Sequence, residues 1–583
     1  VTDLDDFIGA SQACIKPVEV KKNPEAKEST VRTDGRNYYE VAIDGTETQL
    51  EAATISLNDC LACSGCITSA ESILVASQSH HDVYAALATN AVCAPEERKT
   101  IVITLSSQSR ASFAAKYNIS PLSVHKKLFG FFTGLGCHYM VDASFARDFA
   151  LIESAREFMR RFKSVNGGVG GGVSTDGVLP MLASACPGWI CYAEKTHDYI
   201  LPNISTTKSP QQIMGTLLKT YFAEQMNLPS PASVYHVSVM PCYDKKLEAS
   251  RADFYNDVYR TRDVDTVITT GEVERMLKEK GVSFLDLPEG SLSDLFTRVH
   301  HTSLSFQNPN EMTIDQVLTG SEGSSSGGYL SYIFRYAVRE LYGISLTPAH
   351  VELGTTSQEP FVNPDGTLSP DTPAWSVVIK PGRNLDFSEV VFKVGPLETL
   401  KFAKAYGFRN IQNLVRKAKP ASVSSSAGSS NGPSPSGGPI RSVRSNRIRA
   451  SKDDSGAAHH FVEVMACPSG CINGGGQLKP DSFDSQGNEV DGGPASKEYV
   501  INAENIYLDV GRKAFLEPDM NPSVVHLYQY VQDFGIGAGL TNFLFFVRRW
   551  LGGLDSEESR KLLHTQYHEI AKLTQVNGLN VKW

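Results

Sequence analysis

The chain has 583 residues, enough for about two to four domains, and its 41% hydrophobic and 20% charged residues are typical of a globular protein. Its 55 basic and 64 acidic residues give a net charge of −9, which argues against electrostatic binding of nucleic acid or anionic lipid. Eleven cysteines form an odd and unevenly spread set, unlike a secreted disulfide framework. We therefore expect a reducing compartment, where thiols serve metal binding or chemistry.

Residues 1–95 are predicted to form a small N-terminal module that depends on a bound ligand. The chain opens with Val-Thr-Asp-Leu-Asp-Asp, which lacks the cationic and apolar character of a signal peptide. The module contains the compact run Cys60-Leu-Ala-Cys63-Ser-Gly-Cys66. Three thiolates so close together repel one another unless a cation neutralises them.

This C-x2-C-x2-C spacing lets one loop contact three corners of a cubane iron-sulfur cluster. In bacterial ferredoxins a fourth cysteine before a proline follows shortly, but Ala70 occupies that offset here and no proline follows. The fourth ligand must be remote, and the spacing does not choose among Cys14, Cys93 and Cys137. Zinc is the alternative metal, but its sites usually come as two C-x2-C pairs, so the triplet favours an iron-sulfur cluster.

From residues 101–105 onward, short apolar runs alternate with amphipathic segments, which predicts an α/β protein with buried strands. A helix is predicted over 144–162, with an aromatic face and charged side chains mostly elsewhere. A strand at 264–271 is followed by a helix at 272–280, and the 495–583 segment reads as helical, with one helix over 557–573.

Two further stretches bear on the organisation of the chain. Residues 420–459 are rich in Ser, Gly and Pro and are predicted to be a disordered insertion between the segments 96–419 and 460–583. The apolar stretch 534–547 falls short of the roughly 20 residues needed to cross a bilayer, so no membrane association is expected.

A second set of cysteines is dispersed. Cys186, Cys242 and Cys467 each follow an apolar run, at 178–185, 234–240 and 461–466. If these runs are parallel strands, each cysteine lies at a carboxyl end, where open α/β sheets bind ligands. The three thiols are therefore predicted to converge, although almost 300 residues separate the first from the last.

The three segments Ser-Ala-Cys186-Pro-Gly-Trp, Met-Pro-Cys242-Tyr-Asp-Lys and Met-Ala-Cys467-Pro-Ser-Gly-Cys471 resemble the cluster-binding motifs of iron-only hydrogenases. With the N-terminal triplet, the chain resembles the Nar family of hydrogenase-like proteins (nuclear prelamin A recognition factor-like), which act in cytosolic iron-sulfur protein assembly. The resemblance implies two α/β lobes with mostly parallel sheets around a buried 4Fe-4S cluster, and a small ferredoxin-like N-terminal module with a second 4Fe-4S cluster. The implied ligands are Cys186, Cys242, Cys467 and Cys471 for the buried cluster, and Cys14, Cys60, Cys63 and Cys66 for the N-terminal one.

One departure from true hydrogenases bears on activity. The hydrogenase motif has a proton-donating cysteine immediately before the first ligand, and Ala185 stands there in this chain. Lys245 matches a lysine that contacts the diiron unit of hydrogenases, and Cys471 matches their bridging cysteine. We expect Lys245 to balance the negative charge of a thiolate-bound cluster, and we expect no hydrogenase activity.

The resemblance also implies a role and partners. The protein would link early P-loop scaffold ATPases to a late targeting complex with a WD-repeat scaffold, in the cytoplasm and also in the nucleus. Trp583, at the last position, is a candidate anchor for that complex. The alternatives are a hydrogenase, an electron carrier or redox sensor, and a zinc-binding interaction protein. Cys93, Cys137 and Cys191 are predicted to be packed thiols without a function.

Overall fold

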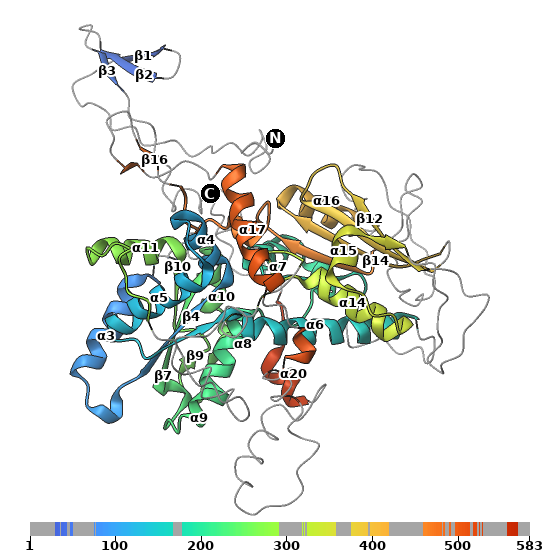
Figure 1. The fold of residues 1–583 in the computed structure, drawn as a ribbon, viewed down its shortest axis with the longest axis horizontal. Coiled ribbons are helices and arrows are strands. Elements are labelled where there is room, and N and C mark those ends of the chain that lie inside the picture. The colour runs from blue at the N-terminus through green and yellow to red at the C-terminus, as the bar shows by residue number, and fades with distance from the viewer. Residues whose placement is uncertain are drawn as a thin grey trace, which may run out of the picture. The chain divides into compact units, whose positions relative to one another are not determined.

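The structure is a computed structural model, shown in Figure 1. Four of the predicted ligands, Cys14, Cys60, Cys63 and Cys66, lie outside the residues that it describes, as do Trp583 and all but the last residue of the 420–459 insertion. The described residues are 29–34, 37–42, 47–49, 75, 77–166, 178–290, 318, 320, 323–356, 375–394, 397–418, 459–480, 482–483, 489–490, 496–513, 517–521, 524, 528 and 557–568.

The chain divides into two compact units, Val1–Leu74 and Val75–Trp583. In the first unit, three strands form an antiparallel sheet with β2 at its centre. The predicted ferredoxin-like arrangement of its cysteines lies outside the described residues. The three strands are β1 (Ser29–Asp34), β2 (Asn37–Ala42) and β3 (Glu47–Gln49).

One lobe of the second unit is built on a four-stranded parallel sheet in the order β10-β7-β4-β5. Its strands are short and buried on both faces; in β4, for example, Ile101 and Val102 point to opposite faces and are 0% and 1% exposed. Helices cover the two faces, as this pattern requires. The predicted strands at 101–105 and 234–240 are confirmed. The strands are β4 (Thr100–Leu105), β5 (Tyr139–Asp142), β7 (Val234–Met240) and β10 (Thr266–Thr269).

The other lobe holds a six-stranded sheet in the order β11-β12-β13-β14-β15-β6. Strands β14, β15 and β6 are parallel, whereas β11 to β14 run antiparallel, a meander that the sequence patterns did not predict. The predicted α/β fold with mostly parallel sheets is confirmed. The strands are β6 (Met181–Ala183), β11 (Thr355–Thr356), β12 (Trp375–Pro381), β13 (Phe387–Val394), β14 (Leu397–Tyr406) and β15 (Phe461–Met465).

Helix α6 (Ala143–Asn166) confirms the helix predicted over 144–162 and packs against α8 and α14. Its aromatic residues, such as Phe149 and Phe158, are fully buried, but so are the charged side chains of Glu153, Glu157 and Arg161. The helix is therefore largely enclosed up to Arg161, and its buried charged side chains bond to protein partners instead of water.

The helix predicted over 557–573 is confirmed over 557–563 and wrong over 564–568, and residues 569–573 lie outside the described residues. Helix α20 spans Glu557–Leu563 and ends there because the next backbone groups are bonded elsewhere. His564 forms an isolated antiparallel bridge with Thr207, and the Thr565 N–H donates to the Thr206 carbonyl at 2.7 Å. A backbone N–H used in this way cannot extend a helix.

The remaining principal helices surround the two sheets (Figure 1). Within the described residues, no helix is long and apolar enough to cross a membrane. These helices are α3 (His80–Val92), α4 (Ser107–Tyr117), α5 (Pro121–Leu135), α7 (Pro187–Thr196), α8 (Pro210–Leu217), α10 (Asp244–Ser250), α11 (Thr270–Glu279), α14 (Tyr329–Tyr342), α15 (Pro348–Leu353), α16 (Phe408–Ala418) and α17 (Lys497–Lys513).

Candidate functional site

The first cysteine of the site, Cys186, lies between strand β6 and helix α7, whose N-cap it forms. Ser184 fixes this turn, because its hydroxyl donates to the Val464 carbonyl at 2.5 Å and accepts the Cys186 N–H at 3.1 Å. Backbone N–H groups of Trp189 and Ala466 donate to the Cys186 sulfur, the latter at 3.4 Å. The Cys186 thiol is therefore held where N–H dipoles favour its ionised form.

Cys242 lies between strand β7 of the other sheet and helix α10, one residue before the helix N-cap. The residue before it, Pro241, accepts a hydrogen bond from the Gly476 N–H at 2.9 Å. The loop that carries Cys242 is thereby tied to the loop that carries the last two cysteines. The three cysteines were predicted to follow strands whose ends lie close together. In the structure these strands belong to two sheets: β6 and β15 to one, and β7 to the other.

Cys467 and Cys471 lie in the loop after strand β15, and Gly470 makes this loop possible. Gly470 has φ +80° and ψ −164°, a conformation open essentially to glycine alone. A Cβ atom there would lie 2.3 Å from the Ser326 hydroxyl oxygen. Ser326 accepts the Cys471 N–H at 3.0 Å, so a side chain at position 470 would displace a residue that orients Cys471.

The four thiols are close enough for the charge of one to raise the pKa of another. Burial raises the pKa of Cys467 well above its usual range, and the other three thiols raise it further. The pKa of Cys242 is also raised well above its usual range, first by burial and then by the charges of Asp244 and the neighbouring cysteines. Burial also raises the pKa of Cys186, and it raises that of Cys471 to about 12. The structure thus brings Cys186, Cys242, Cys467 and Cys471 together, and as thiolates they need a compensating positive charge.

The spacing of the sulfur atoms distinguishes two kinds of metal site. A single zinc ion bound at about 2.3 Å requires sulfur atoms roughly 3.8 Å apart. Among the described residues, no three cysteine sulfurs lie within 4.8 Å of one another. The four cysteines are too widely spaced for one tetrahedral ion, and a polynuclear cluster, whose metal atoms each take one thiolate, fits the donor set.

Lys245 is the cationic side chain beside the thiols. Its charge lowers the pKa of Cys186, Cys242 and Cys471, although burial outweighs this effect. Its ammonium group also donates to Glu248 at 2.9 Å, and Glu248 in turn accepts from Gln211 and Ser209 at 3.0 Å and 2.9 Å. The sequence-based expectation of a charge-balancing lysine agrees with this position, but Glu248 takes up part of its charge.

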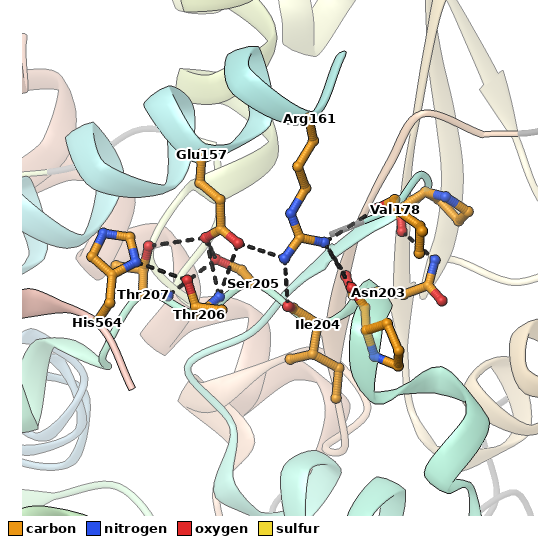
Figure 2. A network of polar contacts seen from close by, with 11 residues as sticks. Glu157, Arg161, Val178, Asn203, Ile204, Ser205, Thr206, Thr207 and His564 are labelled. Atoms are coloured by element: carbon orange, nitrogen blue, oxygen red, sulfur yellow. Dashed lines mark hydrogen bonds and ion pairs between the residues drawn. The ribbon is translucent and has the colours of Figure 1, made fainter. Parts of the chain in front are cut away.

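A buried polar network holds the segments around strand β6 (Figure 2). The Arg161 guanidinium is 1% exposed and donates to Glu157 at 2.5 Å. Glu157 also accepts from the Ser205 hydroxyl at 2.7 Å and from the Thr206 N–H. Helix α6 thereby fixes the chain before and after the Cys186 turn. The carbonyl groups that Arg161 binds are those of Val178, Pro202, Asn203 and Ile204.

Ala185 borders a small hollow beside the cysteine pocket. Glu248, Arg251 and Cys191 line it, and the Arg251 guanidinium lies 5.9 Å from the ring centre of Tyr567, which closes another side. The position next to the first cysteine of the site therefore presents a methyl group to this hollow.

The three unassigned thiols lie in other surroundings. Cys137 is buried in the core of the four-stranded lobe, which raises its pKa to about 12. Cys93 is the C-cap of helix α3, and Cys191 lies on α7 at the hollow. Sequence reasoning missed Ser184 and Ser326, the hydroxyls that fix the cysteine turns. The run Ser324-Ser325-Ser326 before two glycines was the available signal for the second.

The chain matches known proteins over its whole length. Residues 99–475 match the family model of the iron only hydrogenase large subunit, C-terminal domain. The "Cytosolic iron-sulfur assembly component 3" of Rattus norvegicus is 43% identical over 100% of this chain and 98% of the rat protein. The "Cytosolic Fe-S cluster assembly factor narfl" of Xenopus tropicalis is 42% identical with the same coverage. The chain belongs to the narfl family.

The narfl-family fold is also that of a solved hydrogenase. An apo [FeFe]-hydrogenase from Chlamydomonas reinhardtii superposes with a TM-score of 0.53 at 23% identity, covering 84% of this chain and 99% of the hydrogenase. This likeness concerns the fold, and it agrees with the two lobes that enclose the four cysteines.

We predict that Gly470→Ala destabilises this narfl-family chain, because it forces alanine into a glycine-only conformation and drives its Cβ into Ser326. The backbone strain alone costs about 1–3 kcal/mol in free energy of unfolding. Gly475→Ala is the matched control, since no atom lies within 4 Å of its added Cβ, and its effect should stay within about 0.5 kcal/mol. Urea unfolding of both variants measures the difference; equal stabilities would contradict the role of Gly470.

Proposed function

We propose that this protein is a component of the cytosolic iron-sulfur protein assembly machinery and carries two 4Fe-4S clusters. The observation that carries the proposal is the pocket of four mutually facing cysteines, in a chain 43% identical over its full length to an iron-sulfur assembly component. The cytosolic location follows from the names of those relatives, and the nucleus is a further proposed location.

The buried cluster is held by Cys186, Cys242, Cys467 and Cys471. Iron supplies the positive charge that keeps these four sulfurs as thiolates. The N–H groups of Trp189 and Ala466 stabilise negative charge on Cys186, and the Ser326 hydroxyl bonds to Cys471 and lowers its pKa. Hydrogen bonds to ligand sulfurs are a known means by which a protein tunes a cluster.

The second cluster is assigned to Cys14, Cys60, Cys63 and Cys66. Its support is the C-x2-C-x2-C spacing of the last three, together with the family to which the chain belongs. Cys14 is the ligand that rests on the family resemblance alone.

The two assignments are tested by counting iron and acid-labile sulfide in protein purified without oxygen. Wild type should hold about eight of each per chain, and Cys471→Ala and Cys60→Ala should each lose about four, because each removes a ligand of a different cluster. Cys93→Ala, in a partly buried thiol at the end of α3, is the control and should keep all of them. Unchanged counts in both ligand variants, or an equal loss in the control, would refute the assignments.

We infer that the protein is not a hydrogenase. Hydrogen chemistry at a metal requires a group that delivers a proton, and the side chain of Ala185 has none to give. Lys245, the nearest cationic group, is engaged with Glu248 at 2.9 Å. We therefore propose that the hydrogenase-like fold serves in this protein to hold a cluster and not to catalyse hydrogen chemistry.

A hydrogen-evolution assay on the cluster-loaded protein tests this inference. With reduced viologen as electron donor under anaerobic conditions, hydrogen should not rise above the level of a protein-free sample. A hydrogenase assayed in parallel shows that the donor is competent. Evolution of hydrogen that scales with protein concentration would establish the enzyme alternative.

The proposed partners are P-loop scaffold ATPases, which supply clusters, and a late targeting complex with a WD-repeat scaffold, which passes them to apoproteins. Trp583 is proposed as the anchor for the targeting complex, because a terminal aromatic ring is a large apolar group that a partner pocket can bury. Lys582 precedes it, where proteins of this pathway often carry a small or acidic residue.

Deletion of Trp583 should reduce co-purification with the targeting complex at least tenfold, while the iron content of the protein is unchanged. Trp583→Phe keeps an aromatic ring at the terminus and is expected to recover most of the binding. Full recovery of the complex with the deleted protein would reject Trp583 as the anchor.

A further inference from the structure

Away from the cysteine pocket, two histidines and a glutamate from separate helices meet. His80 and His81 begin helix α3, and Glu279 ends helix α11. One nitrogen of each imidazole and one carboxylate oxygen of Glu279 all lie within 4.8 Å of one another. Among the described residues, no other three His, Cys, Asp or Glu side chains bring their ligand atoms this close together.

The fold holds His80 in place beside Glu279. This side chain is 2% exposed, and its Nε2 lies 2.9 Å from Glu279 Oε1. The preceding segment is pinned as well, since the Gln78 amide donates to the Lys246 carbonyl at 2.9 Å and to the Ser250 hydroxyl at 2.7 Å. His81 and Glu279 are exposed, so the third ligand and the open side of the site face solvent.

The distances suit a transition metal. Two ligand atoms, each about 2.1 Å from one ion, lie roughly 2.9–3.4 Å apart for octahedral to tetrahedral angles, and the His80–Glu279 separation of 2.9 Å falls in this range. Two imidazoles and one carboxylate favour first-row transition metals over calcium or magnesium.

We propose that His80, His81 and Glu279 form a binding site for a divalent first-row transition-metal ion such as Zn²⁺ or Fe²⁺. Three protein ligands leave at least one position for water, which makes the site exchangeable instead of purely structural. The ion clamps the start of α3 to the end of α11. Helix α11 begins beside the cysteine loop, where the Gly271 N–H donates to the Gly476 carbonyl at 2.9 Å, and its ten residues span about 15 Å.

The site is independent of the cysteine ligands, and this allows a clean test on the cluster-loaded protein. Anaerobically purified protein is equilibrated by dialysis against buffered Zn²⁺, and zinc and iron are counted in the same sample. Wild type should bind about one zinc more per chain than His81→Gln or Glu279→Gln at equal iron content. Both substituted residues are exposed, so the fold and the clusters should persist, and the iron count verifies this in each sample.

The matched control is His459→Gln. His459 also pairs with a glutamate, Glu389, at 2.6 Å, but this pair lacks a third ligand within reach among the described residues. The His459→Gln variant should bind as much zinc as wild type. Replacing Zn²⁺ by Mg²⁺ in the dialysis should abolish the difference between wild type and His81→Gln. Equal zinc binding by wild type, His81→Gln and Glu279→Gln would overturn the proposal, and so would a similar loss in His459→Gln.

Discussion

The constraint on which the site depends is the enclosure of four thiols in one pocket. Each thiolate makes its neighbours harder to ionise, and burial raises the pKa of all four. Without a metal these raised pKa values keep the thiols protonated, and four thiolates require a compensating positive charge. The free energy of metal binding therefore contributes to the free energy of folding where the two lobes meet at this pocket.

This constraint explains why the loops around the pocket are stiff. The cysteines come from two sheets, and specific hydrogen bonds join them: Ser184 links the Cys186 turn to strand β15, and Pro241 links the Cys242 turn to Gly476. Behind them, Arg161 binds four backbone carbonyls around the β6 segment, where unpaired groups would otherwise be buried (Figure 2). A ligand set spread over almost 300 residues of sequence is thereby held in place by hydrogen bonds between the segments that carry it.

Much of this could be predicted where local pattern and buried structure coincide. The apolar runs before Cys242 and Cys467 are strands of buried residues, whereas in the run at 178–185 before Cys186 only Met181–Ala183 forms a strand. Local pattern failed where distant partners decide: the charged residues of α6 are buried because Tyr528, Ser559 and His564 satisfy Glu153. For the same reason nothing near residues 80–81 in the sequence pointed to Glu279, which lies 199 positions from His80.

The surroundings of Ala185 indicate how a hydrogenase-like fold can serve to hold a cluster. A proton path needs a chain of groups that can gain and lose a proton, and the alanine next to the first cysteine is not such a group. Lys245 remains, but its ammonium divides its charge between Glu248 and the thiols. Fixed N–H dipoles add to the compensation of negative charge at Cys186, where Trp189 and Ala466 direct their N–H groups. Backbone N–H groups do not titrate, so their contribution to charge compensation does not change with pH. We infer that the pocket is organised for retention of a cluster at constant charge.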